Sequence, residues 1–308
     1  MKNLPIVIWQ LSDKRRGHDR QSLGLSNALS KLITAETHIV TVESFKLLNL
    51  LRRGFSPPQE LPLPHLIIGA GHQCQNALIK AKKTAGGLSI CLMKPSLPRA
   101  WFDLCIIPEH DKVSRRQNTI ETKGVLNPVV SKIAPPLNNG VVLIGGPSRH
   151  HNWDANDLVS QIRTIIEDDS HTTWTIANSR RTPSGTANLI MNDLILKDKF
   201  FQIDDLPLNW IDQKIESCGR IWVTADSVSM IFEALSTKAK VGIIDVPAKR
   251  SDRINTIAPN LQKLGWVYHG DVTPDIHRPN LNEANRCAMT ILKRWPSLMT
   301  ANSNSSLP

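Results

Sequence analysis

Short apolar runs alternate with amphipathic segments of helical length along most of the chain. Apolar positions that recur every three or four residues predict helices over residues 21–32, 73–82, 157–166 and 228–236. The apolar runs predict buried strands over residues 6–9, 38–42, 66–68, 88–92, 104–107, 141–144, 173–176, 221–223 and 241–244. Strands that alternate with helices are typical of an α/β fold with parallel sheets.

The alternation stops once, at residues 133–140, where two prolines, two asparagines and a glycine form a segment without periodicity. We therefore expect a first domain over residues 1–133, a linker over 134–140 and a second domain over 141–280. Residues 283–295 predict a late helix that Pro296 ends, and residues 298–308 predict a flexible polar tail.

Charge and composition limit the kinds of partner that this chain is expected to bind. Lys and Arg exceed Asp and Glu by 37 to 27, a net charge of +10, which favours anionic ligands or an anionic membrane face. One tyrosine and 5% aromatic residues provide few platforms for stacking bases, so we expect no nucleic-acid partner. The five cysteines form no CxxC pair, and no apolar run approaches the roughly 20 residues of a membrane span. These features predict a soluble cytoplasmic protein without a signal peptide.

Residues 221–235 combine a strand, a short polar loop and a helix. The first turn of a helix presents unpaired backbone N–H groups and the positive end of its dipole, which together favour an anion. Ser227 and Ser229 add hydroxyl donors, and Glu233 lies on the same helical face as an acceptor. This set suits the diphosphate and ribose of a nucleotide. The plainer alternative is an Asp226 or Ser227 helix cap with a solvated Glu233.

Other polar loops follow strands at the sheet edge where α/β proteins bind ligands. Residues 145–151 begin with paired glycines, which either allow a close backbone approach to a ligand or only form a turn. Residues 178–183 carry adjacent arginines, which suit a nucleoside diphosphate. Residues 69–74 lack the third glycine of a dinucleotide-binding motif, and residues 226–230 lack the glycines of a nucleophile elbow. A dehydrogenase and a serine hydrolase are therefore disfavoured.

Three histidines, His18, His72 and His110, each follow a strand of the first half and could meet around one cleft. A loop histidine that is only structural or exposed is the alternative for each. Glu109 and Asp111 could add metal ligands, but no HxH, HExxH or DxD spacing supports a metal. We expect neither a bound metal ion nor a cofactor.

Taken together, the loops resemble the mitochondrial fission family of proposed glycosyltransferases. The similarity runs in order through nearly the whole chain. It is carried by residues 9–13, 17–21, 68–72, 102–105, 108–111, 144–149, 179–183 and 224–230.

The resemblance implies a glycosyltransferase-B-like architecture. Two Rossmann-like parallel-sheet domains would face a cleft, with the acceptor side first and the nucleotide-sugar side second. A C-terminal helix over residues 281–297 would pack back on the first domain. The chain departs from the family where Lys238 and Lys240 replace a helix-ending Gly and Pro, and where Lys14 and Arg16 replace Gly and Pro. A residue other than glycine in a left-handed cap costs roughly 1 kcal/mol, so we expect a different helix end.

The main hypothesis is a metal-independent glycosyltransferase that uses a nucleoside-diphosphate sugar as donor. His18, oriented by Asp13 or Asp19, would deprotonate the acceptor hydroxyl. The residues expected to bind the donor are Gly145, Gly146, Ser148, Arg149, Ser179, Arg180, Arg181, Ser227, Ser229 and Glu233.

The expected acceptor is an envelope glycan or glycolipid. Residues 45–55 combine apolar positions with Arg52 and Arg53, which suits peripheral contact with the inner face of an anionic membrane and equally suits a buried helix. Two alternatives remain open: a non-enzymatic adaptor, because plant relatives act in organelle fission, and a sugar-nucleotide epimerase, because epimerases share the fold.

Overall fold

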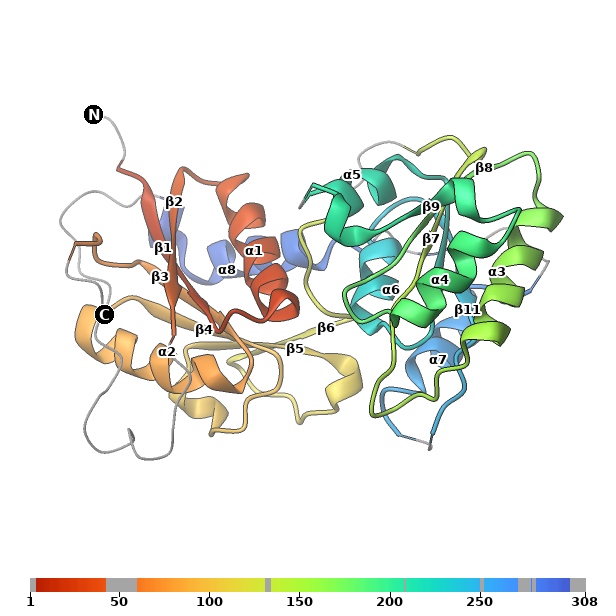
Figure 1. The fold of residues 1–308 in the computed structure, drawn as a ribbon. Coiled ribbons are helices and arrows are strands. Elements are labelled where there is room, and N and C mark those ends of the chain that lie inside the picture. Colours follow the sequence, from red (N-terminus) through yellow and green to blue (C-terminus); the bar gives the residue numbers. More distant parts are fainter. Residues whose placement is uncertain are drawn as a thin grey trace. The chain divides into compact units, whose positions relative to one another are not determined.

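The chain folds into two units, one of which is built from both ends of the sequence. In this computed structural model, Met1–Pro128 and Asn282–Pro308 form the first unit, and Val129–Leu281 form the second (Figure 1). The structure describes residues 4–42, 60–130, 134–207, 209–249, 252–270, 278 and 281–299. The apolar segment at 45–55 lies outside these residues.

The first unit contains a six-stranded parallel sheet with the strand order β2-β1-β3-β4-β5-β6. Its strands are β1 (Ile6–Ser12), β2 (Ala35–Thr41), β3 (Leu66–Ala70), β4 (Leu88–Leu92), β5 (Leu104–Pro108) and β6 (Thr119–Thr122). The strand order places β1, β3, β4 and β5 side by side, so the loops that follow them share one edge of the sheet.

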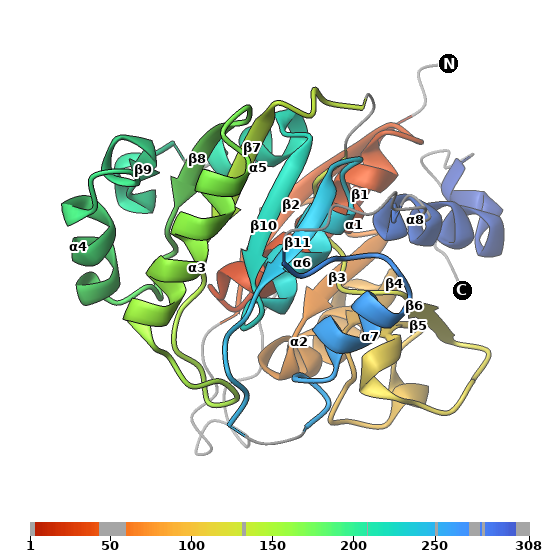
Figure 2. The same cartoon turned by 90° about the vertical axis from the view of Figure 1, so that its right-hand side faces the viewer.

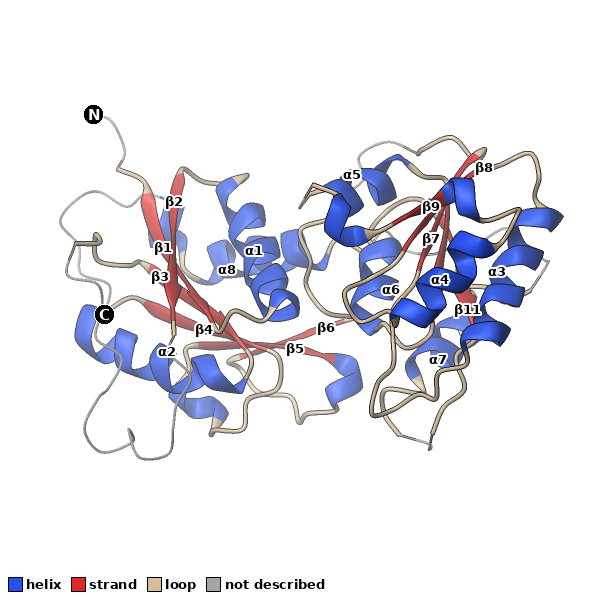
Figure 3. Ribbon diagram, in the orientation of Figure 1, coloured by secondary structure: helices blue, strands red, loops and turns tan. Residues whose placement is uncertain are grey.

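Helices cover both faces of this sheet (Figure 3). They are α1 (Arg16–Ser30), α2 (His72–Ala85) and α8 (Glu283–Arg294), with short 3-10 turns η2 (Arg99–Trp101), η3 (Glu109–Asp111) and η6 (Pro296–Met299). In β1, Ile6 and Ile8 pack in one core cluster with α1 and α8, whereas Val7 and Trp9 pack in another with α2. Alternate side chains of a strand point to opposite faces, so the unbroken apolar run is explained by a sheet that is buried on both sides.

The second unit contains a five-stranded parallel sheet with the order β11-β10-β7-β8-β9 (Figure 2). Its strands are β7 (Asn139–Leu143), β8 (Thr173–Ala177), β9 (Phe200–Phe201), β10 (Arg220–Thr224) and β11 (Lys240–Ile244). Its helices are α3 (Ala155–Asp168), α4 (Ser184–Asn192), α5 (Trp210–Ser217), α6 (Val228–Leu235) and α7 (Ile257–Lys263), with 3-10 turns η4 (Lys197–Lys199) and η5 (Ile203–Asp205). Helices α3 and α4 share a core cluster with Val142 and Ile144, while Val141 and Leu143 on the other face are also fully buried.

The observed elements confirm the expected α/β class with two parallel sheets and differ from the expectations in detail. Strand β7 begins at Asn139, inside the segment expected to be a linker. The short strands β6 and β9 were not predicted, because each has too few apolar residues for a periodic signal. Leu298 was expected in the flexible tail, but it lies in η6 and is buried in the core of the first unit. The rest of that tail, from residue 300, lies outside the described residues.

The end of α6 shows how the chain dispenses with a glycine cap. The helix ends at Leu235, and Ser236 keeps a right-handed conformation with φ of −80°. The guanidinium of Arg278 donates to the carbonyl oxygens of Leu235, Thr237 (2.7 Å) and Ala239 (2.9 Å). Burial lowers the pKa of Arg278 to about 10, which leaves it charged at neutral pH. An arginine therefore satisfies the carbonyl of the last helical residue, Leu235, together with two carbonyls of the segment that follows the helix.

No helix among the described residues is long and apolar enough to cross a membrane.

Candidate functional site

In the first unit, a buried carboxylate holds a partly exposed imidazole at the end of β1. Oδ2 of Asp13 lies 2.8 Å from Nδ1 of His18, and the side chains are 0% and 17% exposed respectively. Asp13 follows the last residue of β1, and its Oδ1 accepts from the backbone N–H of Arg15 at 3.1 Å. His18 lies in the first turn of α1. The strand end and the helix start together bring the two side chains into contact.

The imidazole of His18 also lies against Gly71, in the loop after the neighbouring strand β3. Gly71 has φ of 80°, and a Cβ there would lie 2.3 Å from Cε1 of His18. Only glycine, which has no side chain, can adopt this backbone conformation and leave this space for the His18 imidazole. The glycine therefore makes room for the histidine, a role that its own loop sequence could not reveal.

The structure distinguishes between the two carboxylates proposed to orient His18. Asp13 makes the hydrogen bond, while Oδ1 of Asp19 is buried without a hydrogen-bond partner among the described residues. Both carboxylates lie near Cys74, whose pKa burial raises to about 12, with a smaller contribution from their negative charge. A thiol with such a pKa is inert at neutral pH.

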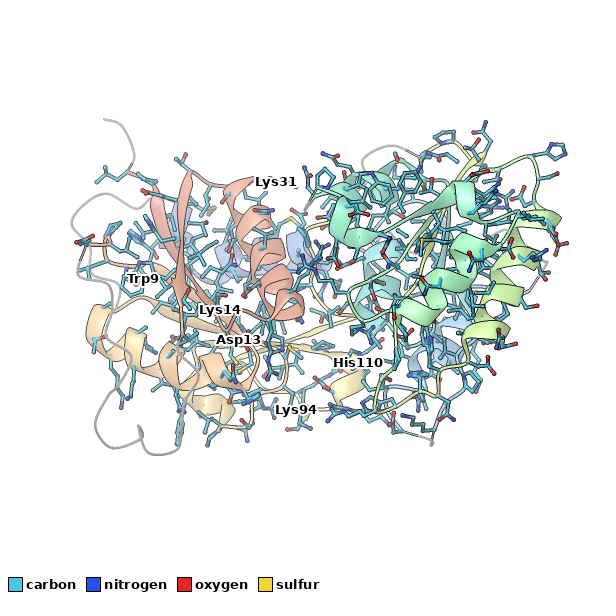
Figure 4. All side chains as sticks on the ribbon, viewed as in Figure 1. Trp9, Asp13, Lys14, Lys31, Lys94 and His110 are labelled. Atoms are coloured by element: carbon cyan, nitrogen blue, oxygen red, sulfur yellow. The ribbon has the colours of Figure 1, made fainter. Side chains whose placement is uncertain are left out.

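The other two histidines come from neighbouring loops. His72 is the exposed first residue of α2, and His110 belongs to η3 after β5. Figure 4 labels His110 and Asp13 in the first unit. Among the residues that the structure describes, no three His, Cys, Asp or Glu side chains are grouped to hold a metal ion.

Left-handed backbone conformations recur at this edge of the sheet. They occur at Lys14 (φ 61°) after β1, Gly71 after β3, Met93 (φ 70°) after β4 and Lys112 (φ 43°) after η3. For residues other than glycine, this conformation costs roughly 1–2 kcal/mol each. Strain of this kind is concentrated at functional sites in proteins. The edge that carries His18 is thus the strained edge of the first unit.

In the second unit, Asp226 links the loops that follow β7, β8 and β10. Its Oδ2 accepts from the backbone N–H of Gly146 (3.0 Å) and from Nη2 of Arg181 (2.8 Å). Its Oδ1 accepts from the hydroxyl of Thr224 (2.7 Å), which itself accepts from the N–H of Gly145 (2.8 Å). The Asp226 side chain is 0% exposed, whereas that of Arg181 is 46% exposed. A buried charge with this many partners holds three loops in one arrangement.

This network gives the paired glycines a different role from the expected one. A Cβ on Gly145 would lie 2.4 Å from Oδ2 of Asp226, and one on Gly146 would lie 2.2 Å from the carbonyl oxygen of Arg181. The hydroxyl of Ser179 donates to the carbonyl oxygen of Gly145 at 2.8 Å. The amides of Gly145 and Gly146 and the hydroxyl of Ser179 therefore bind protein groups, and the glycines allow loops to approach loops.

Ser148 and the two histidines after it close the β7 loop. The hydroxyl of Ser148 accepts from the backbone N–H of His150 and of His151, both at 3.1 Å. Nδ1 of His150 lies 2.6 Å from Oδ2 of Asp252, and this hydrogen bond lowers the pKa of Asp252 to about 2. Burial lowers the pKa of His151. The sequence did not point to Asp252, because no local pattern connects residues about a hundred positions apart.

The remaining predicted donor-binding residues lie at the same strand ends. Ser227 is the N-cap of α6 and makes no side-chain capping bond, and Ser229 is exposed in its first turn. Arg149 and Arg180 are exposed, and Arg180 forms an exposed ion pair with Asp204 at 3.3 Å. Glu233, expected to meet a ribose, is only 6% exposed. The alternative interpretation, an Asp226 or Ser227 cap with a solvated Glu233, is wrong for Asp226, which lies at the centre of the loop network, and for Glu233, which is buried, while Ser227 does occupy the N-cap position.

A cavity of about 400 Å³ adjoins these loops at the ends of β10 and β11. His151, Ala225, Val246, Asn255 and His269 are among the residues that line it. Its volume is in the range of small-molecule sites. The sequence gave no indication of this cavity, because its walls come from separate loops and from α7.

Two Rossmann-like units with polar loops at the carboxyl ends of their parallel strands define the glycosyltransferase-B-like fold. Two solved structures share it along nearly their whole length. A provisionally assigned UDP-N-acetylglucosamine 2-epimerase from Listeria monocytogenes aligns with a TM-score of 0.54 and 10% identity, over 99% of this chain and 100% of that one. The S. aureus MnaA protein in a co-structure with UDP aligns with a TM-score of 0.51 and 13% identity, over 98% and 100%. At such identities the likeness concerns the fold alone.

The chain belongs to the mitochondrial fission ELM1 family, whose profile matches residues 16–295. The uncharacterized protein RP120 of Rickettsia prowazekii (strain Madrid E) is 25% identical over an alignment 344 residues long, gaps included. The alignment covers 92% of this chain and 97% of that protein. The family predicted from the loop sequences is thereby confirmed.

Proposed function

We propose that this protein is a glycosyltransferase that moves a sugar from a nucleoside-diphosphate donor to a hydroxyl group of an acceptor. One observation carries the proposal: Asp13 binds Nδ1 of His18, which leaves Nε2 as the basic nitrogen. A buried carboxylate that fixes the tautomer of an accessible imidazole is the arrangement of a general base.

The transfer comprises one proton transfer, one bond formed and one bond broken. Nε2 of His18 takes the proton of the acceptor hydroxyl, and the oxygen forms a bond to the anomeric carbon of the donor sugar. The bond from that carbon to the diphosphate oxygen breaks, and the diphosphate leaves with the electron pair. The imidazolium formed on His18 is stabilised by Asp13 until the proton passes to water.

On the donor side, we assign the diphosphate to exposed groups rather than to the glycine amides. Arg181 reaches Asp226 just before α6 with part of its side chain exposed, and Arg149 and Arg180 are exposed in the loops after β7 and β8. Together they would offset the charge of the leaving diphosphate without a metal ion. Ser229 adds an exposed hydroxyl donor in the first turn of α6, whereas Ser227 at its N-cap is only 7% exposed. The adjoining cavity has room for a nucleobase.

The first test is a thermal-shift screen with UDP-, GDP-, CMP- and ADP-sugars. A ligand that binds only the folded protein raises the unfolding temperature. With a binding donor in hand, His18→Ala should lower kcat by about 10²–10⁴-fold and leave donor affinity unchanged. His72→Ala, an exposed histidine one loop away, is the matched control. If no sugar nucleotide raises the unfolding temperature, the proposal is wrong and a non-enzymatic adaptor is favoured.

A sugar-nucleotide epimerase is the second candidate. Of the two similar structures named above, one is described as a UDP-N-acetylglucosamine 2-epimerase and the other is a co-structure with UDP. Incubation with the donor alone separates the two. An epimerase changes the sugar of the donor in the absence of an acceptor, whereas a transferase forms its product only when an acceptor is present.

A further inference from the structure

Two lysines flank the His18 site from the strands on either side of Gly71. Lys14 follows β1 and Lys94 follows β4, and β3, which ends beside Gly71, lies between these strands in the sheet. Neighbouring strands are roughly 4.8 Å apart, so β1 and β4 are separated by about 10 Å. Two lysine side chains can span that distance and meet one anionic group. Figure 4 shows both residues in the first unit, together with Asp13.

Neither lysine has a carboxylate partner among the described residues. Lys94 is exposed, and its ammonium group donates to the backbone carbonyl of Asp111 at 3.2 Å. That bond places the Lys94 ammonium group beside η3, on the β5 side of β4, and leaves its other protons available. Lys14 is exposed, while the neighbouring carboxylate of Asp13 is buried against His18. The edge thus presents two positive charges that no carboxylate of the described residues pairs with.

The backbone is held in an unfavourable conformation at Lys14 and at Met93, the residue before Lys94. Lys14 itself has φ of 61°, and Met93, directly before Lys94, has φ of 70°. Glycine would adopt these conformations without strain. A lysine in place of glycine at such a position points to a use for its side chain.

We propose that the acceptor carries a phosphate group, which Lys14 and Lys94 bind so that a hydroxyl of the same molecule reaches Nε2 of His18. The chemical class is a phosphorylated polyol, either a soluble sugar phosphate or the head group of an anionic lipid. This inference rests on the proposed transfer at His18, although the phosphate site itself can be measured without turnover.

The experiment compares Lys14→Gly, Lys94→Ala and the double variant with Lys31→Ala. Lys31 is an exposed lysine at the C-terminal end of α1, whereas His18 lies in the first turn, so its substitution removes the same charge at the opposite end of the helix (Figure 4). Two probes distinguish the sources: glucose 6-phosphate, and vesicles of phosphatidylcholine with phosphatidylglycerol. Each single variant should weaken binding of the preferred probe by about tenfold, and the double variant by more, because each removes one charge-assisted contact. Lys31→Ala should bind as the wild type does.

Lys14→Gly separates binding from folding. Relief of the strained φ should raise the unfolding temperature by about 2–4 °C while binding falls. Met93→Gly, which relieves the same kind of strain and keeps both lysines, should gain stability and keep its affinity. A purely structural role for Lys14 predicts no loss of binding.

The proposal is overturned if neither probe binds, if the double variant binds like the wild type, or if Lys31→Ala weakens binding as much as Lys14→Gly does. Its failure is distinct from failure of the transferase function. Lysine-dependent phosphate binding without any response to sugar nucleotides would contradict only the transferase. Donor binding and His18-dependent turnover with phosphate-free acceptors, unaffected by the double variant, would contradict only the phosphate site.

Discussion

The imidazole of His18 fills the space beside Gly71 that a side chain there would occupy. An added Cβ would lie 2.3 Å from Cε1 and 2.5 Å from Nδ1 of His18. The two residues belong to loops after neighbouring strands, so the β3 loop helps to set the position of a histidine that Asp13 orients from β1.

Gly71→Ala should therefore disturb the site as well as the fold. The substitution adds a clash with His18 to backbone strain, and we expect a loss of about 2–4 kcal/mol of stability and at least a tenfold fall in turnover. Gly86→Ala is the matched control, because Gly86 has φ of 77° with nothing within 4 Å of its added Cβ. Chemical unfolding and steady-state kinetics provide the measurements. Equal turnover in the two variants would show that Gly71 does not position His18.

Asp226→Asn should loosen the loops of the second unit. The substitution removes the buried charge that Gly146, Thr224 and Arg181 bind, and we expect a loss of about 2–4 kcal/mol, since Arg181 is partly solvated. Donor affinity should fall with it. Asp204→Asn removes an exposed partner of Arg180 and should cost less than about 0.5 kcal/mol. Urea unfolding of both variants tests this, and equal losses would refute a central role for Asp226.

Arg278→Ala should destabilise the end of α6 by about 2–4 kcal/mol, because three carbonyl groups lose a charged donor. Arg278→Lys should recover only part of this, since an ammonium group lacks the planar fork that reaches several carbonyls. Guanidinium chloride unfolding compares the two variants with the wild type. Full stability of the lysine variant would mean that charge alone, without the fork geometry, is sufficient.

The stability of the first unit should fall in mild acid because of His65. Its Nδ1 accepts a hydrogen bond from the backbone N–H of Val7 at 3.0 Å, and burial lowers its pKa below the ordinary 6.5. The unfolded chain then binds the proton more readily, so this contribution is complete above about pH 6.5 and is lost as the pH falls through the lower pKa of the folded state.

Hydrogen exchange at the Val7 amide reports this effect locally. Exchange should accelerate, after correction for the intrinsic rate, as the pH falls below about 6.5. His65→Asn keeps an acceptor for Val7 but does not titrate, so its protection should be independent of pH over the same range. An unchanged profile in that variant would assign the effect to another group.

Particular residues show how far sequence reasoning reached. The apolar run of β1 predicted a buried strand. The polar residues after the apolar runs predicted that His18, the loop at Gly145 and the start of α6 follow strand ends, and the structure shows them there. The choice between Asp13 and Asp19 stayed open in the sequence, because both lie within five residues of His18. The sequence offered Asp226 only as a possible cap, and the glycines at 145 and 146 as room for a ligand or a turn, because the partners of these glycines lie 79 and 80 residues away.

The sequence by itself determined the local properties of this protein: which segments form strands and helices, that the strands are parallel and buried, and which loops carry charge. These follow from periodicity and composition, which act over a few residues. Only the tertiary structure decided the strand order, and with it that Gly71 meets His18, that Asp226 binds three loops and that Arg278 ends α6. Hydrogen bonds and close contacts are short-ranged in space but join residues far apart in the chain, so they exist only once the sheets have formed.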